Sequence, residues 1–326
     1  MGRGTVNRQV QVGVESTPGT PVAANRVLPT MSLTLSPAIA NRSYRTQGFR
    51  GSTANKITQF DGGGTLSGPL NYLDLIYPLN TIITGVIATP GGGTLSRTHT
   101  FAPVATGTDA YKTLTIQEGD PTAAVQIAYG AMVDFSVSVA EDSSEVAGTL
   151  VGYAPSNVSL TGSPTSVATL PSGPREVDIY IDPTFGAIGT TKVSAALSWN
   201  FAIGSLREKM HVLNTTFQAF HSLTDTAVDL SANFRTEHNL QSRNIFAGVT
   251  ATSNPIQYIR FKSTGPIIEA ALTYYIQLDV AARIIDMNQD SNTAVWGYQY
   301  MLIPEYDSSF GNKLFNLVIQ NNITAL

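Results

Sequence analysis

The chain has 326 residues, a formal net charge of −4 and no cysteine. This length favours two domains, and the lack of cysteine excludes disulfide frameworks, thiolate metal sites and cysteine nucleophiles. Lys and Arg form no run and no stripe interleaved with aromatics, which argues against a nucleic-acid-binding surface. Charged residues make up 13%, about half the ~25% of an ordinary soluble domain. Such a composition suits a surface covered by neighbouring copies, or else a β-rich protein with a neutral polar exterior.

The N-terminal stretch MGRGTVNRQVQVG has no apolar segment of the signal-peptide type, and no stretch approaches 18 uninterrupted apolar residues. We therefore expect neither secretion through a standard signal nor a membrane-spanning helix. A turn-rich segment, VGVESTPGTPVAANRVLP, follows at residues 12–29. Apolar and polar residues then alternate over residues 31–35, which predicts a half-buried strand.

A helix of about two turns is predicted over residues 67–78. Ser67 can cap its start, Pro69 suits its first turn, and Pro78 limits its length. The next segment, residues 84–110, is rich in Gly, Pro and Thr and is expected to form a long loop or hairpin.

Two further strands are indicated by strict alternation, over residues 133–139 and 272–280. A second helix is expected within residues 235–248, with Leu240, Ile245 and Phe246 on one side and Gly248 as its end. The uncharged stretch 154–174 is rich in Ser, Thr, Pro and Gly and is typical of a linker. We therefore predict a first domain over residues 1–160, a linker over 161–174, and a second domain with a C-terminal strand over 175–326.

The two halves have similar features in the same order. Aligning VDIYIDPTFGAIGTTKVSAALSWNF with the turn-rich segment pairs Glu15 with Asp182 and Gly19 with Gly186. Each half then has a short helix, a turn and a long alternating strand, with Asp134 and Asp279 in similar places. This order predicts an internal duplication, a β-rich α+β fold of two tandem domains with one short helix each. Two unrelated β domains with generic strand–turn chemistry are the alternative.

We find no catalytic, cofactor-binding or metal-binding constellation. The four histidines are scattered, with no pair at metal-ligand spacing. The glycine-rich stretches DGGGT and PGGGT lack the Lys-Ser/Thr of a phosphate loop, and no GxSxG motif is present. We therefore predict that the protein is not an enzyme.

Several stretches together resemble the tail tube (major tail) proteins of long-tailed bacteriophages. These are VGVESTPGTPVAANRVLP, YRTQGFRG, GTLSGPLNYLDLIYPL, PREVDIYIDPTFGAIGTTK with the later LSW, and the terminal EYDSSFGNKL. The resemblance implies β-sandwich or half-barrel tube domains that assemble into stacked rings, a hollow conduit for double-stranded DNA in the virion, built in the host cytoplasm. Implied partners are copies of the chain itself, a tape-measure protein, and tail-terminator or distal-tail proteins; DNA passes without specific binding, and no membrane is involved.

If six tube domains complete a ring, two domains per chain give a trimer with pseudo-sixfold symmetry. A DNA conduit should present neutral or acidic groups inward, because each Lys or Arg on a phosphate adds affinity. The expected lumen-lining residues are Asp134, Ser136, Ser138, Thr273, Gln277 and Asp279. Arg283 lies on the same face and opposes this assignment unless it pairs with an acid.

Contacts between rings are expected from the N-terminal arm, residues 1–11, and from two turns. The residues concerned are Glu15, Pro18, Gly19, Pro90, Gly91, Gly92 and Gly93. Two other functions stay open at this point. One is a distal-tail or baseplate ring protein with the same fold, and the other is a β-sandwich glycan-binding adhesin. Against the adhesin, Trp199 and Trp296 are the only tryptophans, and Trp199 lies in an alternation typical of a core.

Overall fold

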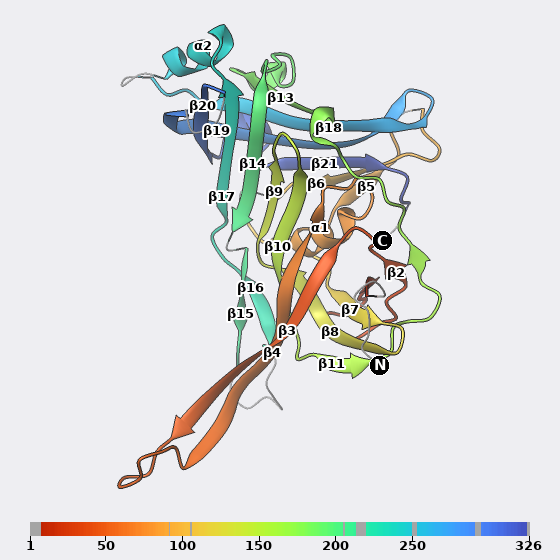
Figure 1. Cartoon of the computed structure of the whole chain (residues 1–326). Helices are drawn as coiled ribbons and strands as arrows, with labels where there is room; N and C mark the ends of the chain where they lie inside the picture. Colours follow the sequence, from red (N-terminus) through yellow and green to blue (C-terminus); the bar gives the residue numbers. More distant parts are fainter. Residues whose placement is uncertain are drawn as a thin grey trace.

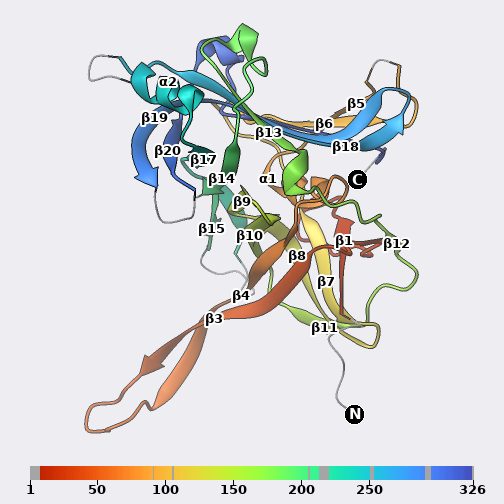
Figure 2. The same ribbon diagram turned by 45° about the horizontal axis from the view of Figure 1, so that its top comes forward.

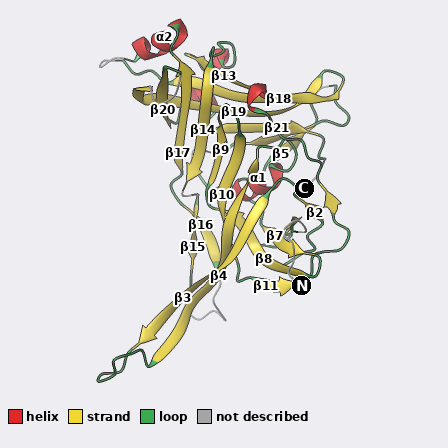
Figure 3. Ribbon diagram, viewed as in Figure 1, coloured by secondary structure: helices red, strands yellow, loops and turns green. Residues whose placement is uncertain are grey.

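The structure, a computed structural model, describes residues 8–90, 92–104, 106–204, 206–212, 220–249, 253–290 and 295–324. It confirms a mainly β fold with two short α-helices in this part of the chain (Figure 3). The elements of the first half are β1 (Gln9–Val14), β2 (Arg26–Val27), β3 (Ser32–Tyr44), β4 (Ala54–Pro69), α1 (Ile76–Ile82), β5 (Val86–Ala88), β6 (Arg97–Phe101), β7 (Leu114–Asp120), β8 (Ala123–Met132), β9 (Phe135–Val139), β10 (Ser144–Gly152), β11 (Ser156–Val158) and β12 (Thr165–Ser166). Those of the second half are β13 (Val177–Asp182), β14 (Ala196–Gly204), β15 (Arg207–Met210), β16 (Ser222–Asp225), β17 (Asp229–Glu237), α2 (Leu240–Gly248), β18 (Gln257–Glu269), β19 (Leu272–Asp290), β20 (Gly297–Pro304) and β21 (Asn316–Asn321).

The same series of antiparallel strand pairings occurs twice along the chain. In the first half the pairs are β1–β7, β7–β8, β8–β11, β3–β4, β4–β10 and β10–β9. In the second half they are β13–β18, β18–β19, β19–β21, β14–β17, β17–β20 and β20–β19. The long strand β19 therefore takes the place of β8 and β9 together. A helix follows the second strand of the hairpin in both halves, α1 after β4 and α2 after β17.

Strand pairing also crosses between the halves. β9 pairs with β14, and β6 pairs with β21, both antiparallel (Figure 1). One run of eight neighbouring strands results, in the order β3, β4, β10, β9, β14, β17, β20, β19. The sheet is thus continuous across the boundary expected at residues 161–174.

Alternation along the strands gives this eight-stranded sheet one apolar face. β10 alternates between buried and less buried residues along its whole length, and β9 does the same. Their buried residues join one large core together with Leu33, Leu66 and Phe234. Period-two alternation places every second side chain on the core side, so the sequence pattern accounts directly for this face.

The first helix lies further along the chain than the sequence pattern predicts. Ser67 and Pro69 belong to the end of β4, and the helix runs from Ile76 to Ile82 with Pro78 in its first turn. Proline is tolerated there because the first N–H groups of a helix have no intrahelical partner. All seven residues are buried, so packing stabilises this short helix. The expectation of a helix over residues 67–78 was therefore wrong in position.

The second helix, α2, ends at Gly248 and agrees with the prediction for residues 235–248. One detail differs, because Leu240 is 71% exposed and does not face the core. The side chain of Phe246 lies outside the described residues. The stretch 154–174 contains two short strands, and only β12 lies within the linker expected at residues 161–174. β11 pairs with β8, and β12 pairs in parallel with β2.

Two hairpins extend from the lower end of the sheet. The longer is β3–β4, whose strands pair from Ser32 with Ser67 out to Tyr44 with Ala54. Beyond Gly62, which pairs with Gly152, β4 has only β3 as a neighbour, and the hairpin projects from the body as an arm in both views (Figures 1 and 2). The shorter hairpin, β15–β16, lies beside its base. The segment 84–110 also contains a hairpin, β5–β6, which was one of the two forms expected for it.

Candidate assembly interface

The joint between β9 and β14 holds the two four-stranded units of the eight-stranded sheet together. Its register runs from Trp199 opposite Val139 to Ile203 opposite Phe135, with Phe201 opposite Val137 at the centre. All six of these side chains are at most 6% exposed. Burial of such large apolar side chains contributes about 1.5–3 kcal/mol each. The joint therefore combines backbone pairing with a packed apolar core.

Aromatic contacts pack β14, the second-half strand of this joint, against other residues of the second half. The rings of Trp199 and Phe261 stack with centroids 4.3 Å apart, and Phe201 meets Phe315 edge-on at 5.6 Å. Trp199 is therefore a core residue, as its alternation indicates. This leaves Trp296, 53% exposed and stacked on His238, as the exposed tryptophan.

Both outer strands of the eight-stranded sheet have an open edge among the described residues. β3 pairs with β4 only. β19 pairs with β20 through Asp290, but its partner on the other side, β18, ends its pairing at Ala282. Residues 283–290 therefore present backbone groups without a neighbouring strand. Open edges of this kind are templates for pairing with another chain.

The face of this sheet opposite the core carries small, mostly uncharged side chains. Ser136 lies opposite Ala147 and Ala202, and Ser138 lies opposite Glu145 and Asn200. The same rows continue through Ser67 and Ser32 on one side, and through Ser231 and Asn233 on the other. A face with few charges neither attracts phosphate strongly nor needs ion pairs. Ser136 and Ser138 thus share one polar face, with Asp134 in the bulge beside them.

The other three expected lumen residues lie on a different part of the sheet. Thr273, Gln277 and Asp279 belong to the stretch of β19 that pairs with β18 and β21. Asp279 is 4% exposed and forms a bidentate pair with Arg260, at 2.6 and 2.9 Å. Its carboxylate is therefore neutralised by Arg260 within the chain. The structure does not place these three residues on the polar face of the eight-stranded sheet.

The position equivalent to Asp134 is Asp286 rather than Asp279. Leu150 lies opposite Met132 in the first half, as Leu302 lies opposite Ile284 in the second. Asp134 follows Met132 by two residues, and Asp286 follows Ile284 by two residues. Each aspartate lies next to an irregularity in the strand pairing. Asp134 accepts a hydrogen bond from the backbone N–H of Thr149 on β10, and Asp286 accepts one from the backbone N–H of its neighbour Met287.

Arg283, which opposed a neutral face, is paired with an acid. Its guanidinium donates to the carboxylate of Glu305 and to the backbone oxygen of Asn254. The charge is thereby balanced within the chain, which was the condition set for that face.

The turn at Glu15 is an internal anchor. Glu15 is 4% exposed, and its carboxylate accepts hydrogen bonds from the Gly19 and Tyr129 N–H groups and the hydroxyls of Thr113 and Thr115. Glu15 was expected to contact another ring, but its carboxylate is buried and hydrogen-bonded within the chain. Pro18 is exposed at the same turn, and Gly19 adopts a φ of +80°.

The second half repeats this anchor with Asp182. The carboxylate of Asp182, 1% exposed, accepts from the N–H groups of Gly189, Thr190 and Thr191 and from the Thr190 hydroxyl. Gly189 has a φ of +89°. The alignment of Glu15 with Asp182 therefore has a structural basis. Gly19 corresponds to Gly189, and its alignment with Gly186 was wrong by three residues.

The loop at Pro90 is fixed by a carboxylate from the second half. Glu269 accepts from the N–H groups and hydroxyls of Thr94 and Ser96, and from the Leu95 N–H. These donors lower the pKa of Glu269 to about 2. Pro90 and Gly93 are half-buried, Gly92 is exposed, and Gly91 lies outside the described residues. Residues 1–7 of the N-terminal arm also lie outside them.

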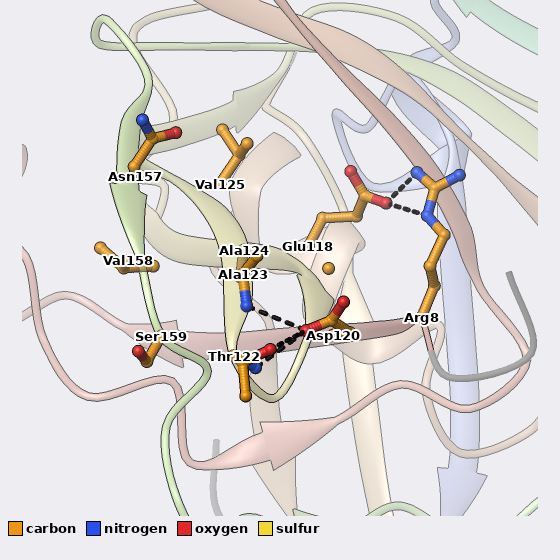
Figure 4. Close-up of a pocket in the computed structure, with 11 residues that line it drawn as sticks. Arg8, Glu118, Asp120, Thr122, Ala123, Ala124, Val125, Asn157, Val158 and Ser159 are labelled. Atoms are coloured by element: carbon orange, nitrogen blue, oxygen red, sulfur yellow. Dashed lines mark hydrogen bonds and ion pairs between the residues drawn. The ribbon is translucent and has the colours of Figure 1, made fainter. Parts of the chain in front are cut away.

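A hollow of about 840 Å³ is an open surface depression at the β7–β8 turn (Figure 4). Arg8 pairs with Glu118 across it. Asp120 accepts hydrogen bonds from its own turn, from the Thr122 hydroxyl and the N–H groups of Thr122 and Ala123. The charged groups in this hollow are thus engaged with their neighbours.

Sequence reasoning missed the β3–β4 arm as a structural feature. Its cations, Arg42, Arg45, Arg50 and Lys56, stand in a stretch from residue 38 to 60 without any acid. The sequence did contain a signal for this arm: a turn with Gly48 and Gly51 stands between two strand-like stretches.

Within the described part of the chain, no group of three or more His, Asp or Glu is arranged to hold a metal ion. No helix there is long and apolar enough to cross a membrane. No family model matches the sequence, and no curated protein matches it.

Proposed function

We propose that this chain is a structural protein that self-assembles into stacked rings, the hollow tail tube of a long-tailed bacteriophage, through which double-stranded DNA passes. The observation that carries the proposal is the β9–β14 joint. It unites two four-stranded units of the same strand order into one sheet, with a core on one face and small polar groups on the other. A protein that joins two such units within one chain has the means to join further units between chains.

The polar face supports the role of a conduit. Duplex DNA carries about one negative charge per 1.7 Å, so a basic wall would hold it. The face containing Ser136, Ser138 and Asn233 instead carries few cations. Arg235 on the same face donates to the backbone oxygen of Val295, and Arg283 beside it is paired with Glu305. On this proposal the lumen is lined by Asp134, Ser136 and Ser138 together with their equivalents Asp286 and Asn288.

Two repeated units per chain support rings of three chains with pseudo-sixfold symmetry. The arm extends past the lower end of the sheet along the strand direction, which suits a contact with the next ring. A head-to-tail contact of this kind does not close on itself and so propagates as a filament. The virion, with tape-measure and terminator or distal-tail proteins as partners, is the proposed setting.

Negative-stain electron microscopy of the purified protein tests this function. We expect hollow tubes of regular axial repeat at raised protein concentration. Single rings that do not lengthen would favour the distal-tail or baseplate function instead. A protein that stays monomeric at every concentration would contradict both, and binding on a glycan array would then favour an adhesin.

A further inference from the structure

We propose that the open edge of β3 in one copy of the chain pairs, antiparallel, with the open edge of β19 in the next copy, so that Thr34 to Pro37 lie opposite Asp290 to Met287. This rests on the proposed ring assembly and names its joint. The occupant of each edge is therefore a second copy of this chain. The register follows from the joint that the chain already makes within itself.

The first step is that β3 is the equivalent of β14. Leu33 lies opposite Leu66 in the β3–β4 hairpin, as Trp199 lies opposite Phe234 in the β14–β17 hairpin. All four residues are buried on the core face. Residues 34–37 of β3 therefore correspond to residues 200–203 of β14.

The second step is that the C-terminal part of β19 is the equivalent of β9. Leu150 lies opposite Met132 in the first half, and Leu302 lies opposite Ile284 in the second. The residue numbers of the two pairs differ by the same 152 residues on both strands. The correspondence continues past the irregularity in each ladder: Ser136 lies opposite Ala147, and Asn288 lies opposite Gln299. Residues 135–138 thus correspond to residues 287–290.

Transferring the internal register onto these equivalents gives the new joint. Within the chain, Ala202 lies opposite Ser136. The equivalent pair between chains is Ser36 opposite Asn288. Both are exposed in the isolated chain and belong to the polar face, so the polar face would continue unbroken from one copy into the next.

The surroundings of the two edges fit a joint of this extent. On β19, the Asn254 side chain donates to the backbone oxygen of Ile284 at 2.9 Å, which covers the edge just before the proposed pairing begins. On β3, Pro37 has no N–H to donate and is a residue found at edges or ends of pairing. The joint would therefore lie between these two limits.

Cysteine cross-linking tests the register, because the natural chain has no cysteine. In assembled protein, the double variant S36C/N288C should form disulfides between chains under mild oxidation. On a non-reducing gel these should appear as dimers and trimers, with no larger species if three chains close a ring. The matched control S136C/A202C, at the internal joint, should form a disulfide within one chain only.

A register-shifted variant, S36C/D286C, keeps both residues on the exposed edges. A slip of two residues separates the Cα atoms by about 8 Å, beyond disulfide reach, so we expect its cross-link yield to be about tenfold lower. If tubes or rings form but S36C/N288C gives no cross-link, the joint is wrong while the proposed function stands. If the internal control cross-links and no assembly forms, the proposed function itself fails.

Discussion

The Arg207 guanidinium donates a hydrogen bond to the backbone oxygen of Thr81, so a hairpin of the second half closes the end of the helix in the first half. The distance is 3.2 Å, and a second bond reaches Ile82 at 2.8 Å. Arg207 is 5% exposed, lies 3.9 Å from the Tyr111 ring centroid, and pairs with Asp225 at 2.8 Å. A cation at a helix C-terminus satisfies carbonyl groups and opposes the helix dipole.

Replacing Arg207 with Met should therefore destabilise the whole fold. The substitution leaves two buried carbonyls and the Asp225 carboxylate without their partner, for which we expect a loss of about 3 kcal/mol in the free energy of unfolding. Urea denaturation followed by circular dichroism measures this. Arg42→Met on the exposed arm is the control and should change the value by less than about 0.5 kcal/mol. Equal effects of the two variants would show that the helix cap contributes nothing special.

Asp74 makes stability depend on pH. It is fully buried, and burial raises the pKa of its carboxyl from 3.8 to about 6, although the Thr30 hydroxyl donates to it. The folded protein therefore binds the proton more tightly than the unfolded chain, and stability falls as the pH rises from about 4 to about 6. The loss should be about 3 kcal/mol, at about 1.4 kcal/mol per pKa unit.

The variant Asp74→Asn should remove this dependence, because the amide is neutral at every pH and still accepts from Thr30. Thermal melts between pH 4 and pH 7 measure it, with Asp142→Asn in the exposed β9–β10 turn as the matched control. A natural protein whose melting temperature does not fall over that range relative to the Asp74→Asn variant would contradict the assignment.

The β3–β4 arm should be needed for stacking and not for ring closure. Ala40 lies opposite Gln59, so a two-residue Asn-Gly turn can connect them in place of residues 41–58 and keep the hairpin. The shortened protein should form rings of normal size that do not lengthen into tubes, as electron microscopy can show. Shortened protein that still forms long tubes would exclude the arm as the contact between rings.

The neutrality of the polar face should decide whether tubes hold DNA. Ser231 is exposed on β17 opposite Ala202, and Ser231→Arg adds one cation per chain to this face. Tubes of this variant should retain duplex DNA in a sedimentation assay at low salt and release it as salt rises. Thr108→Arg adds the same charge in an exposed loop after β6 and is the control. Equal retention by both variants would show that the polar face does not line the channel.

The strands could be predicted because alternation of apolar and polar residues is a local pattern. Alternation in β9 fixed which side chains meet the core, and the Glu15 and Asp182 turns could be aligned because each has an acid followed by a Gly-containing turn. The helix α1 was misplaced because its stability comes from burial of all its residues, which local signals do not reveal. The Pro69 signal belongs instead to the end of β4.

The candidate assembly surface could be predicted only in part. The polar alternation of Ser136 and Ser138 was visible, but the same alternation in Thr273 and Asp279 gave no warning that Arg260 lies opposite Asp279. Which strands pair across the halves, as β9 does with β14, depends on contacts between residues far apart in sequence. No local sequence pattern indicates that residues 283–290 form an open edge. The edge is open because the pairing of β18 with β19 ends at Ala282.

Rotational symmetry of assembled rings, seen end-on by cryo-electron microscopy, tests the central claim most directly. We predict three chains per ring, with density that repeats approximately six times around a hollow centre. A ring of six chains, or an assembly without a central channel, would contradict the account.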